Sequence, residues 1–156
     1  QQKAAYEQAR DEVRKRHAGL LDQVTLAVFS PFDDQWTVSG VCSYSAEVLL
    51  DLGAHFIDED VPELALDAQG GNAWLPYEQL RLLNDADVIL RTPNTDAAFA
   101  TLADNPIWET LPAVQQGMVF PYIHFSATGS YSWAMRNLQD LDQLLAEIQS
   151  RIDNGR

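Results

Sequence analysis

The chain has 156 residues, of which 46% are hydrophobic and 21% are charged, and its formal net charge is −13. These values are typical of one globular domain, and no apolar run approaches the ~18 residues that a membrane-spanning helix needs. The excess negative charge repels phosphate backbones and anionic headgroups, so nucleic acid and membrane surfaces are poor candidates as partners.

Hydrophobic periodicity divides the chain into alternating helices and short strands. In chain order, we predict a helix over 3–21, a strand over 24–29, a short extended segment over 37–40, a helix over 46–52, a strand over 55–57, an irregular loop over 58–75, a helix over 77–84, a strand over 87–91, a helix over 96–103, a connection over 104–117, a strand over 118–122 and a helix over 131–153. No internal repeat or low-complexity segment interrupts this order.

Turn and cap residues mark the ends of these elements. Pro31 is expected to end the first strand, and Pro76 to occupy the first position of the helix that follows it. Ser43 and Thr95 are expected to cap the helices after them, and Gly53 to follow a helix C-terminus in the left-handed conformation.

The alternation of helices with fully apolar strands predicts the α/β class. We expect a three-layer α/β/α lobe with a mostly parallel central sheet, preceded by a long helix. Ligands of such sheets bind outside the carboxyl ends of the strands. The segments 30–40, 91–95 and 122–132 follow three predicted strands and are therefore the candidate ligand-binding segments.

Six side chains in or beside these segments are candidates for ligand contact: Trp36, Arg91, Thr92, Tyr122, His124 and Arg136. Arg91 is notable because a cation directly after an apolar strand is costly to bury alone, and its planar fork suits carboxylate, catecholate or hydroxamate oxygens. Its structural alternative is an ion pair with an acidic neighbour such as Asp33, Asp34 or Asp96. Trp36 is either a stacking platform or a buried packing residue. We expect Trp36, Arg91 and Tyr122 to form one wall of a shared pocket.

Catalysis and resident cofactors are not expected. Cys42 lies near a predicted helix N-terminus, but no G-x-S-x-G, G-x-G-x-x-G or Walker-type motif occurs. As the only cysteine, it cannot form an internal disulfide. The three histidines His17, His55 and His124 are too dispersed in sequence to indicate a zinc site.

Two motifs carry a resemblance to a known family. The first comprises Glu78-Gln79-Leu80 and Asp85-Ala86-Asp87-Val88-Ile89, and the second comprises Asn105-Pro106-Ile107-Trp108, Leu111-Pro112-Ala113-Val114, Gly117, Val119 and Phe120. In combination they resemble the C-terminal lobe of ABC-transporter substrate-binding proteins for iron-siderophores, haem and cobalamin, and most of all the iron-siderophore-binding lipoproteins.

The resemblance implies that residues 1–21 are the linker helix between two lobes and that 22–156 form the C-terminal lobe, with the N-terminal lobe outside the chain. It implies capture of a ferric siderophore for delivery to an ABC permease, with Glu47 as a permease-docking residue. It also implies an extracytoplasmic protein with a lipid anchor. An exposed half-cleft and a linker helix without its other lobe favour self-association of the isolated lobe, because exposed apolar patches tend to find partners. Two alternatives stay open: haem or cobalamin binding by the same fold, and an interaction module that binds no small molecule.

Overall fold

The computed structural model describes residues 1–40, 46–65, 73–123 and 129–155. The helices are α1 (Gln2–Leu21), α2 (Glu47–Asp51), α3 (Asp96–Ala103), α4 (Pro106–Thr110), α5 (Pro112–Gln115) and α6 (Tyr131–Asn154), with 3₁₀ segments η2 (Ile57–Glu59), η3 (Pro62–Leu64) and η4 (Tyr77–Leu83). The strands are β1 (Thr25–Pro31), β2 (Gln35–Ser39), β3 (His55–Phe56), β4 (Leu75–Pro76), β5 (Val88–Arg91) and β6 (Val119–Pro121).

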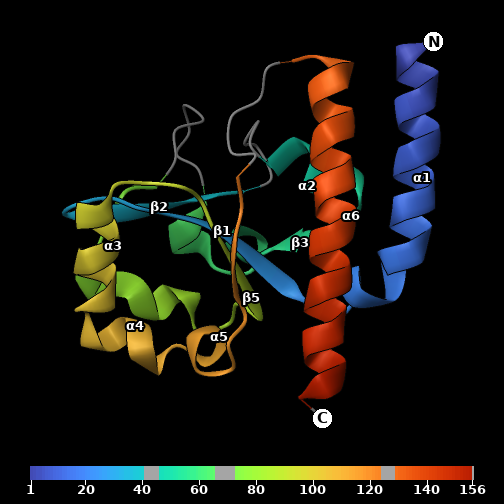
Figure 1. Cartoon of the computed structure of the whole chain (residues 1–156). Coiled ribbons are helices and arrows are strands. Elements are labelled where there is room, and N and C mark those ends of the chain that lie inside the picture. The colour runs from blue at the N-terminus through green and yellow to red at the C-terminus, as the bar shows by residue number, and fades with distance from the viewer. Residues whose placement is uncertain (41–45, 66–72, 124–128, 156) are drawn as a thin grey trace.

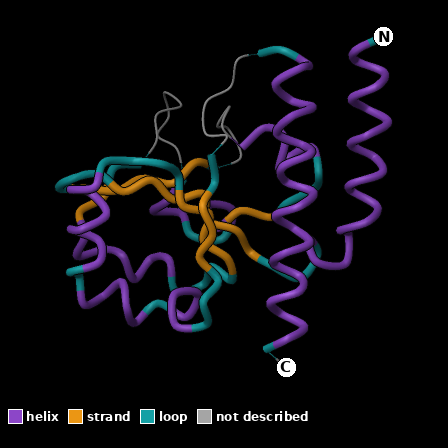
Figure 2. The backbone as a smooth tube through the Cα atoms, viewed as in Figure 1, coloured by secondary structure: helices purple, strands orange, loops and turns teal. Residues whose placement is uncertain are grey.

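One sheet joins these strands in the order β4-β2-β1-β5-β6, with β3 beside the start of β1. Within the described ranges, β1 pairs in parallel with β3 and β5, and β5 with β6, while β2 is antiparallel to β1 and β4. Helices α3, α4 and α5 lie on one side of the sheet and α6 on the other (Figures 1 and 2). The predicted α/β lobe with a mostly parallel central sheet is confirmed.

Helix α1 packs beside α6 rather than on the sheet (Figure 1). The rings of Tyr6 and Tyr131 lie 6.0 Å apart, and His17 Nε2 lies 2.6 Å from Asp142 Oδ1. Both contacts join residues 125 positions apart, so the two helices run parallel in a constant register. No helix in the described part of the chain has the length and apolar character needed to cross a membrane.

The segment after the first strand is a β-hairpin, and β1 continues two residues beyond its predicted end at Phe29, with Pro31 as its last residue. The Phe32 N–H donates to the Gln35 carbonyl at 2.9 Å and closes a turn around Asp33 and Asp34. Antiparallel pairs alternate between bonded and non-bonded types, so the next pair, Pro31 with Trp36, needs no N–H from the proline. Pro31 therefore ends β1 without breaking it.

The predicted helix over 77–84 is a 3₁₀ segment, η4, and Pro76 precedes it as the last residue of β4. The predicted connection over 104–117 contains α4 and α5. Thr95 caps α3 as expected, because its side chain accepts a hydrogen bond from the Ala98 N–H. The N-cap predicted at Ser43 lies outside the described residues.

Gly53 follows α2 with a φ of +87°, as its predicted role requires. The Gly53→Ala variant is expected to lose about 1–2 kcal/mol of unfolding free energy, because an L-residue is strained in this conformation. Gly19 within α1 is the matched control, since a Cβ there has no heavy atom within 4 Å. Gly19→Ala is expected to gain up to about 1 kcal/mol. Urea unfolding of both variants measures the difference, and shifts of the same sign would contradict it.

Candidate functional site

The carboxyl ends of β1, β5 and β6 meet along one edge of the sheet. Arg91 at the end of β5 is in register with Phe29 of β1 and with Pro121 of β6. The Thr92 N–H donates to the Phe29 carbonyl at 2.9 Å, and the Tyr122 N–H donates to the Arg91 carbonyl at 2.8 Å. The segments that follow these strands are thus neighbours, as the sequence predicted.

Trp36 does not present a surface at this edge. Its exposed fraction is 0%, its ring packs 5.7 Å from that of Phe29, and its indole N–H donates to the Pro76 carbonyl at 3.0 Å. Of the two alternatives for Trp36, the structure shows the packing role, and the expected stacking platform is wrong.

Arg91 is half-buried, with its guanidinium 4.3 Å above the ring of Phe99 in α3. Among the described residues, no carboxylate lies within ion-pair distance of Arg91, so the alternative pair with Asp33, Asp34 or Asp96 does not form. A planar cation held on an aromatic ring keeps donors that an anionic ligand can use.

Thr92 and Tyr122 are buried on the opposite face of the sheet from Arg91. Side chains alternate between the two faces along a strand, so Thr92 points away from the side that Arg91 faces. Thr92 is 2% exposed and its hydroxyl lies 2.6 Å from that of Ser30. Tyr122 is also 2% exposed, and Asn137 in α6 is within 3.5 Å of its hydroxyl. Burial raises the pKa of Tyr122 to about 12, despite the opposing effect of the Asn137 hydrogen bond.

The expected single wall of Trp36, Arg91 and Tyr122 is therefore wrong. All three residues lie at one edge of the sheet. Trp36 and Tyr122 are buried there, and their side chains face opposite sides of the sheet. Arg136 is exposed on α6. His124 lies outside the described residues.

Sequence reasoning missed an exposed tryptophan, Trp74, at this edge. Trp74 directly precedes β4, is 51% exposed, and its ring lies 4.9 Å from that of Phe32 at the tip of the β1–β2 hairpin. The segment 58–75 showed no motif, so its tryptophan was not considered. A tryptophan between the sequence Gly-Gly-Asn and a proline was the available signal, because such residues favour loops that other elements seldom cover.

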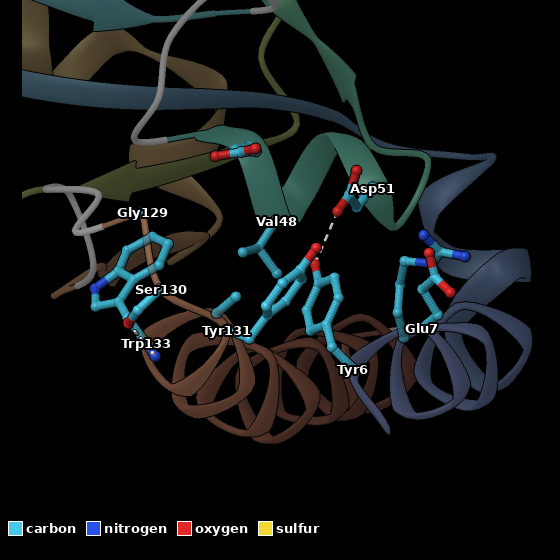
Figure 3. A pocket seen from close by; sticks show the side chains of 11 residues that line it. Tyr6, Glu7, Val48, Asp51, Gly129, Ser130, Tyr131 and Trp133 are labelled. Atoms are coloured by element: carbon cyan, nitrogen blue, oxygen red, sulfur yellow. Dashed lines mark hydrogen bonds between the residues drawn. The ribbon is translucent and has the colours of Figure 1, made fainter. Parts of the chain in front are cut away.

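A hollow of about 310 Å³ lies between α1, α2 and the start of α6 (Figure 3). Trp133 and Ser130 lie at one end and Glu7 at the other, and the Tyr6 hydroxyl donates to Asp51 Oδ2 at 2.8 Å. Burial, followed by this hydrogen bond, raises the pKa of Tyr6. Glu47, the predicted docking residue, is exposed at the start of α2 and lines the same hollow. Three carboxylates, of Glu7, Glu47 and Asp51, line the hollow against one cation, that of Arg10. The hollow therefore carries a net negative charge beside aromatic rings, which suits a cationic side chain.

Comparisons with known proteins assign the family. The profile of the family described as periplasmic binding protein matches residues 1–122. The siderophore periplasmic binding protein from the fuscachelin gene cluster of Thermobifida fusca is 27% identical, with a TM-score of 0.78 over 94% of this chain and 53% of that chain. No curated protein matches the chain.

Two further solved structures are similar in fold. DesE, a ferric-siderophore receptor protein from Streptomyces coelicolor, is 24% identical, with a TM-score of 0.65 over 92% of this chain and 47% of that chain. FhuD2 from Staphylococcus aureus, solved with bound ferrioxamine B, is 19% identical, with a TM-score of 0.68 over 96% of this chain and 57% of that chain. The chain thus spans about half the length of the structures it matches. Because the family profile covers most of its residues, this chain belongs to the periplasmic binding protein family.

Proposed function

We propose that this chain is the C-terminal lobe, with its linker helix, of a two-lobed protein that binds a ferric siderophore for an ABC importer. The observation that carries the proposal is the likeness to a siderophore periplasmic binding protein over 94% of the chain at 27% identity. Coverage of only 53% of that protein is what one lobe of two would give. Under this proposal, residues 1–21 are the linker, 22–156 are the lobe, and the protein works outside the cytoplasm.

The proposed mechanism is ligand binding without a catalysed reaction. A chelate held between two lobes would meet the carboxyl edge of this sheet, where Arg91 supplies a cation and the pair of Trp74 and Phe32 supplies an aromatic surface. Arg136 and His124 are two further proposed contacts of the chelate. Thr92 and Tyr122 are buried beneath the edge, so their proposed part is to support it rather than to touch the ligand.

Delivery to a permease is the second half of the proposal. An exposed carboxylate on a short helix gives register and on-rate through charge complementarity more than raw affinity. Glu47 meets this description, and the acidic hollow beside it extends the surface that a cationic permease side chain would meet. Lipid anchoring and self-association of the isolated lobe stay predictions.

Ligand titration of the two-lobed protein tests the proposal. Ferrioxamine B, a ferric catecholate, ferric citrate, haem and cobalamin are added in turn while tryptophan fluorescence is recorded. We expect quenching by at least one ferric siderophore, with Trp74 as the exposed reporter. Binding of haem or cobalamin, with no binding of a ferric siderophore, would assign the protein to another ligand class. Binding of none would favour the interaction module.

Arg91 should contribute most to anionic chelates. In the two-lobed protein, Arg91→Ala is expected to weaken an anionic ferric chelate roughly tenfold or more, because a charge-assisted hydrogen bond is lost. A neutral chelate should lose far less. Arg81→Ala, at an exposed arginine of η4, is the matched control. Unchanged affinity for every anionic chelate would remove Arg91 from the site.

A further inference from the structure

A row of hydroxyl groups crosses the carboxyl edge of the sheet on the face that α6 covers. Thr37 in β2 pairs with Ser30 in β1, and the Ser30 hydroxyl lies 2.6 Å from that of Thr92. Tyr122 lies beside Thr92, because its N–H bonds the Arg91 carbonyl. Paired residues of neighbouring strands point to the same face. The hydroxyls of Thr37, Ser30, Thr92 and Tyr122 therefore form one row, here called the hydroxyl row.

Each end of the hydroxyl row has a buried polar atom without a hydrogen-bond partner. Thr37 is 3% exposed and Asn137 is 0% exposed. In the described part of the chain, neither Thr37 Oγ1 nor Asn137 Oδ1 has a partner, and the amide nitrogen of Asn137 is a long 3.5 Å from the Tyr122 hydroxyl. Native proteins leave few such atoms unpaired, because each costs the desolvation of a polar group.

The number of hydrogen-bond donors and acceptors shows which kind of group is missing at each end of the hydroxyl row. In the bond between Ser30 and Thr92, one hydroxyl donates and the other keeps its own proton for a further acceptor. Asn137 Oδ1 needs a donor, while Thr37 can both donate and accept. The two ends are three strand spacings apart, at about 4.8 Å each, so one small molecule cannot reach both. The row contains no charged side chain, so each missing partner is small, neutral and able to donate and accept.

We propose that two internal water-binding sites complete the hydroxyl row, one at Thr37 and one between Asn137 and Tyr122. Water fits the proton count, and a buried water typically joins two to four polar groups. Asn137 is the first fully buried residue of α6. The second water therefore joins the start of α6 to the carboxyl edge of the sheet through hydrogen bonds. The other buried residues of α6 are leucine and isoleucine, which pack by apolar contact. This inference needs no ligand and is independent of the proposed transport role.

A near-isosteric apolar substitution of Thr37 distinguishes a water-bonded hydroxyl from an unpaired one by the sign of the change in Tm. Asn137→Leu and Thr37→Val are expected to lower Tm by about 2–6 °C, because the water loses a partner and its other contacts weaken. If Thr37 Oγ1 were unpaired, Thr37→Val would raise Tm, because a buried unsatisfied group would be removed. Asn137→Leu also removes the amide that bonds the Tyr122 hydroxyl, so its Tm should fall in either case. Thr92→Val is the matched control, because its hydroxyl is already paired, so its Tm should fall in either case.

Solution NMR of the unmodified chain gives a second measurement that does not depend on how the variants fold. Long-lived water cross-relaxation with protons of Thr37 and of Tyr122 or Asn137 is expected. A rise in Tm for Thr37→Val, or the absence of water cross-relaxation at both ends of the row, would overturn the proposal.

Discussion

Replacing Trp36 with alanine is expected to lower the free energy of unfolding by about 3–5 kcal/mol. Its side chain is fully buried, and it packs against Phe29, whose ring in turn stacks 5.3 Å from that of Trp108. Truncation opens a cavity between the sheet and α4 and leaves the Pro76 carbonyl without its indole donor. Urea unfolding followed by far-UV circular dichroism measures the loss.

Trp74 provides the matched control within the same chain. It is 51% exposed and its ring contact is with Phe32, so Trp74→Ala should cost less than about 1.5 kcal/mol. Equal losses for Trp36 and Trp74 would contradict their difference in burial. Trp36→Phe separates the two roles of Trp36. If Trp36→Phe keeps its stability but loses siderophore affinity, Trp36 contacts the ligand despite its burial.

The long elements were predictable because their patterns repeat over several turns. Residues 3–21 and 131–153 have helical spacing of apolar residues, and α1 and α6 occupy nearly those ranges. The run Val88-Ile89-Leu90 is apolar on both faces, as a central parallel strand requires. The boundaries of short elements were harder to predict, because a single residue can determine where a short element ends. The pattern predicts that the first strand ends at Phe29, yet the strand continues to Pro31, because the proline falls at a pair that uses no N–H.

The candidate site was predictable in position but not in orientation. A strand end locates Arg91 at the correct edge from sequence alone, because the carboxyl ends of parallel strands meet there. Which face a neighbouring side chain occupies depends on strand register, and a shift of one residue reverses it. The hairpin places Trp36 in a strand rather than a loop, and this register buries its ring. Which ring Trp74 contacts depends on tertiary packing, which a local pattern does not report.

Asp142 is expected to be the polar residue whose loss most weakens the contact of α1 with α6. Its Oδ2 lies 2.5 Å from Arg16 Nη1 and its Oδ1 lies 2.6 Å from His17 Nε2. The His17 side chain is only 7% exposed, so Asp142→Ala leaves a buried ring without its partner. A loss of about 2–4 kcal/mol in unfolding free energy should follow, measured by urea unfolding at pH 7. Glu147→Ala, which removes an exposed pair with Arg151, should cost no more than about 0.5 kcal/mol.

The pH dependence of the same contact has a defined sign. Burial raises the pKa of Asp142, but hydrogen bonds from Arg16 and His17 outweigh it and leave the pKa below its ordinary value. A depressed pKa in the folded state gives stability that is present above about pH 4 and is lost as the pH falls through the folded-state value. The stability gap between the unmodified chain and Asp142→Asn should therefore narrow below about pH 4, because a protonated aspartate resembles asparagine. A gap that stays constant down to pH 2 would show that charge at Asp142 does not hold α1 to α6.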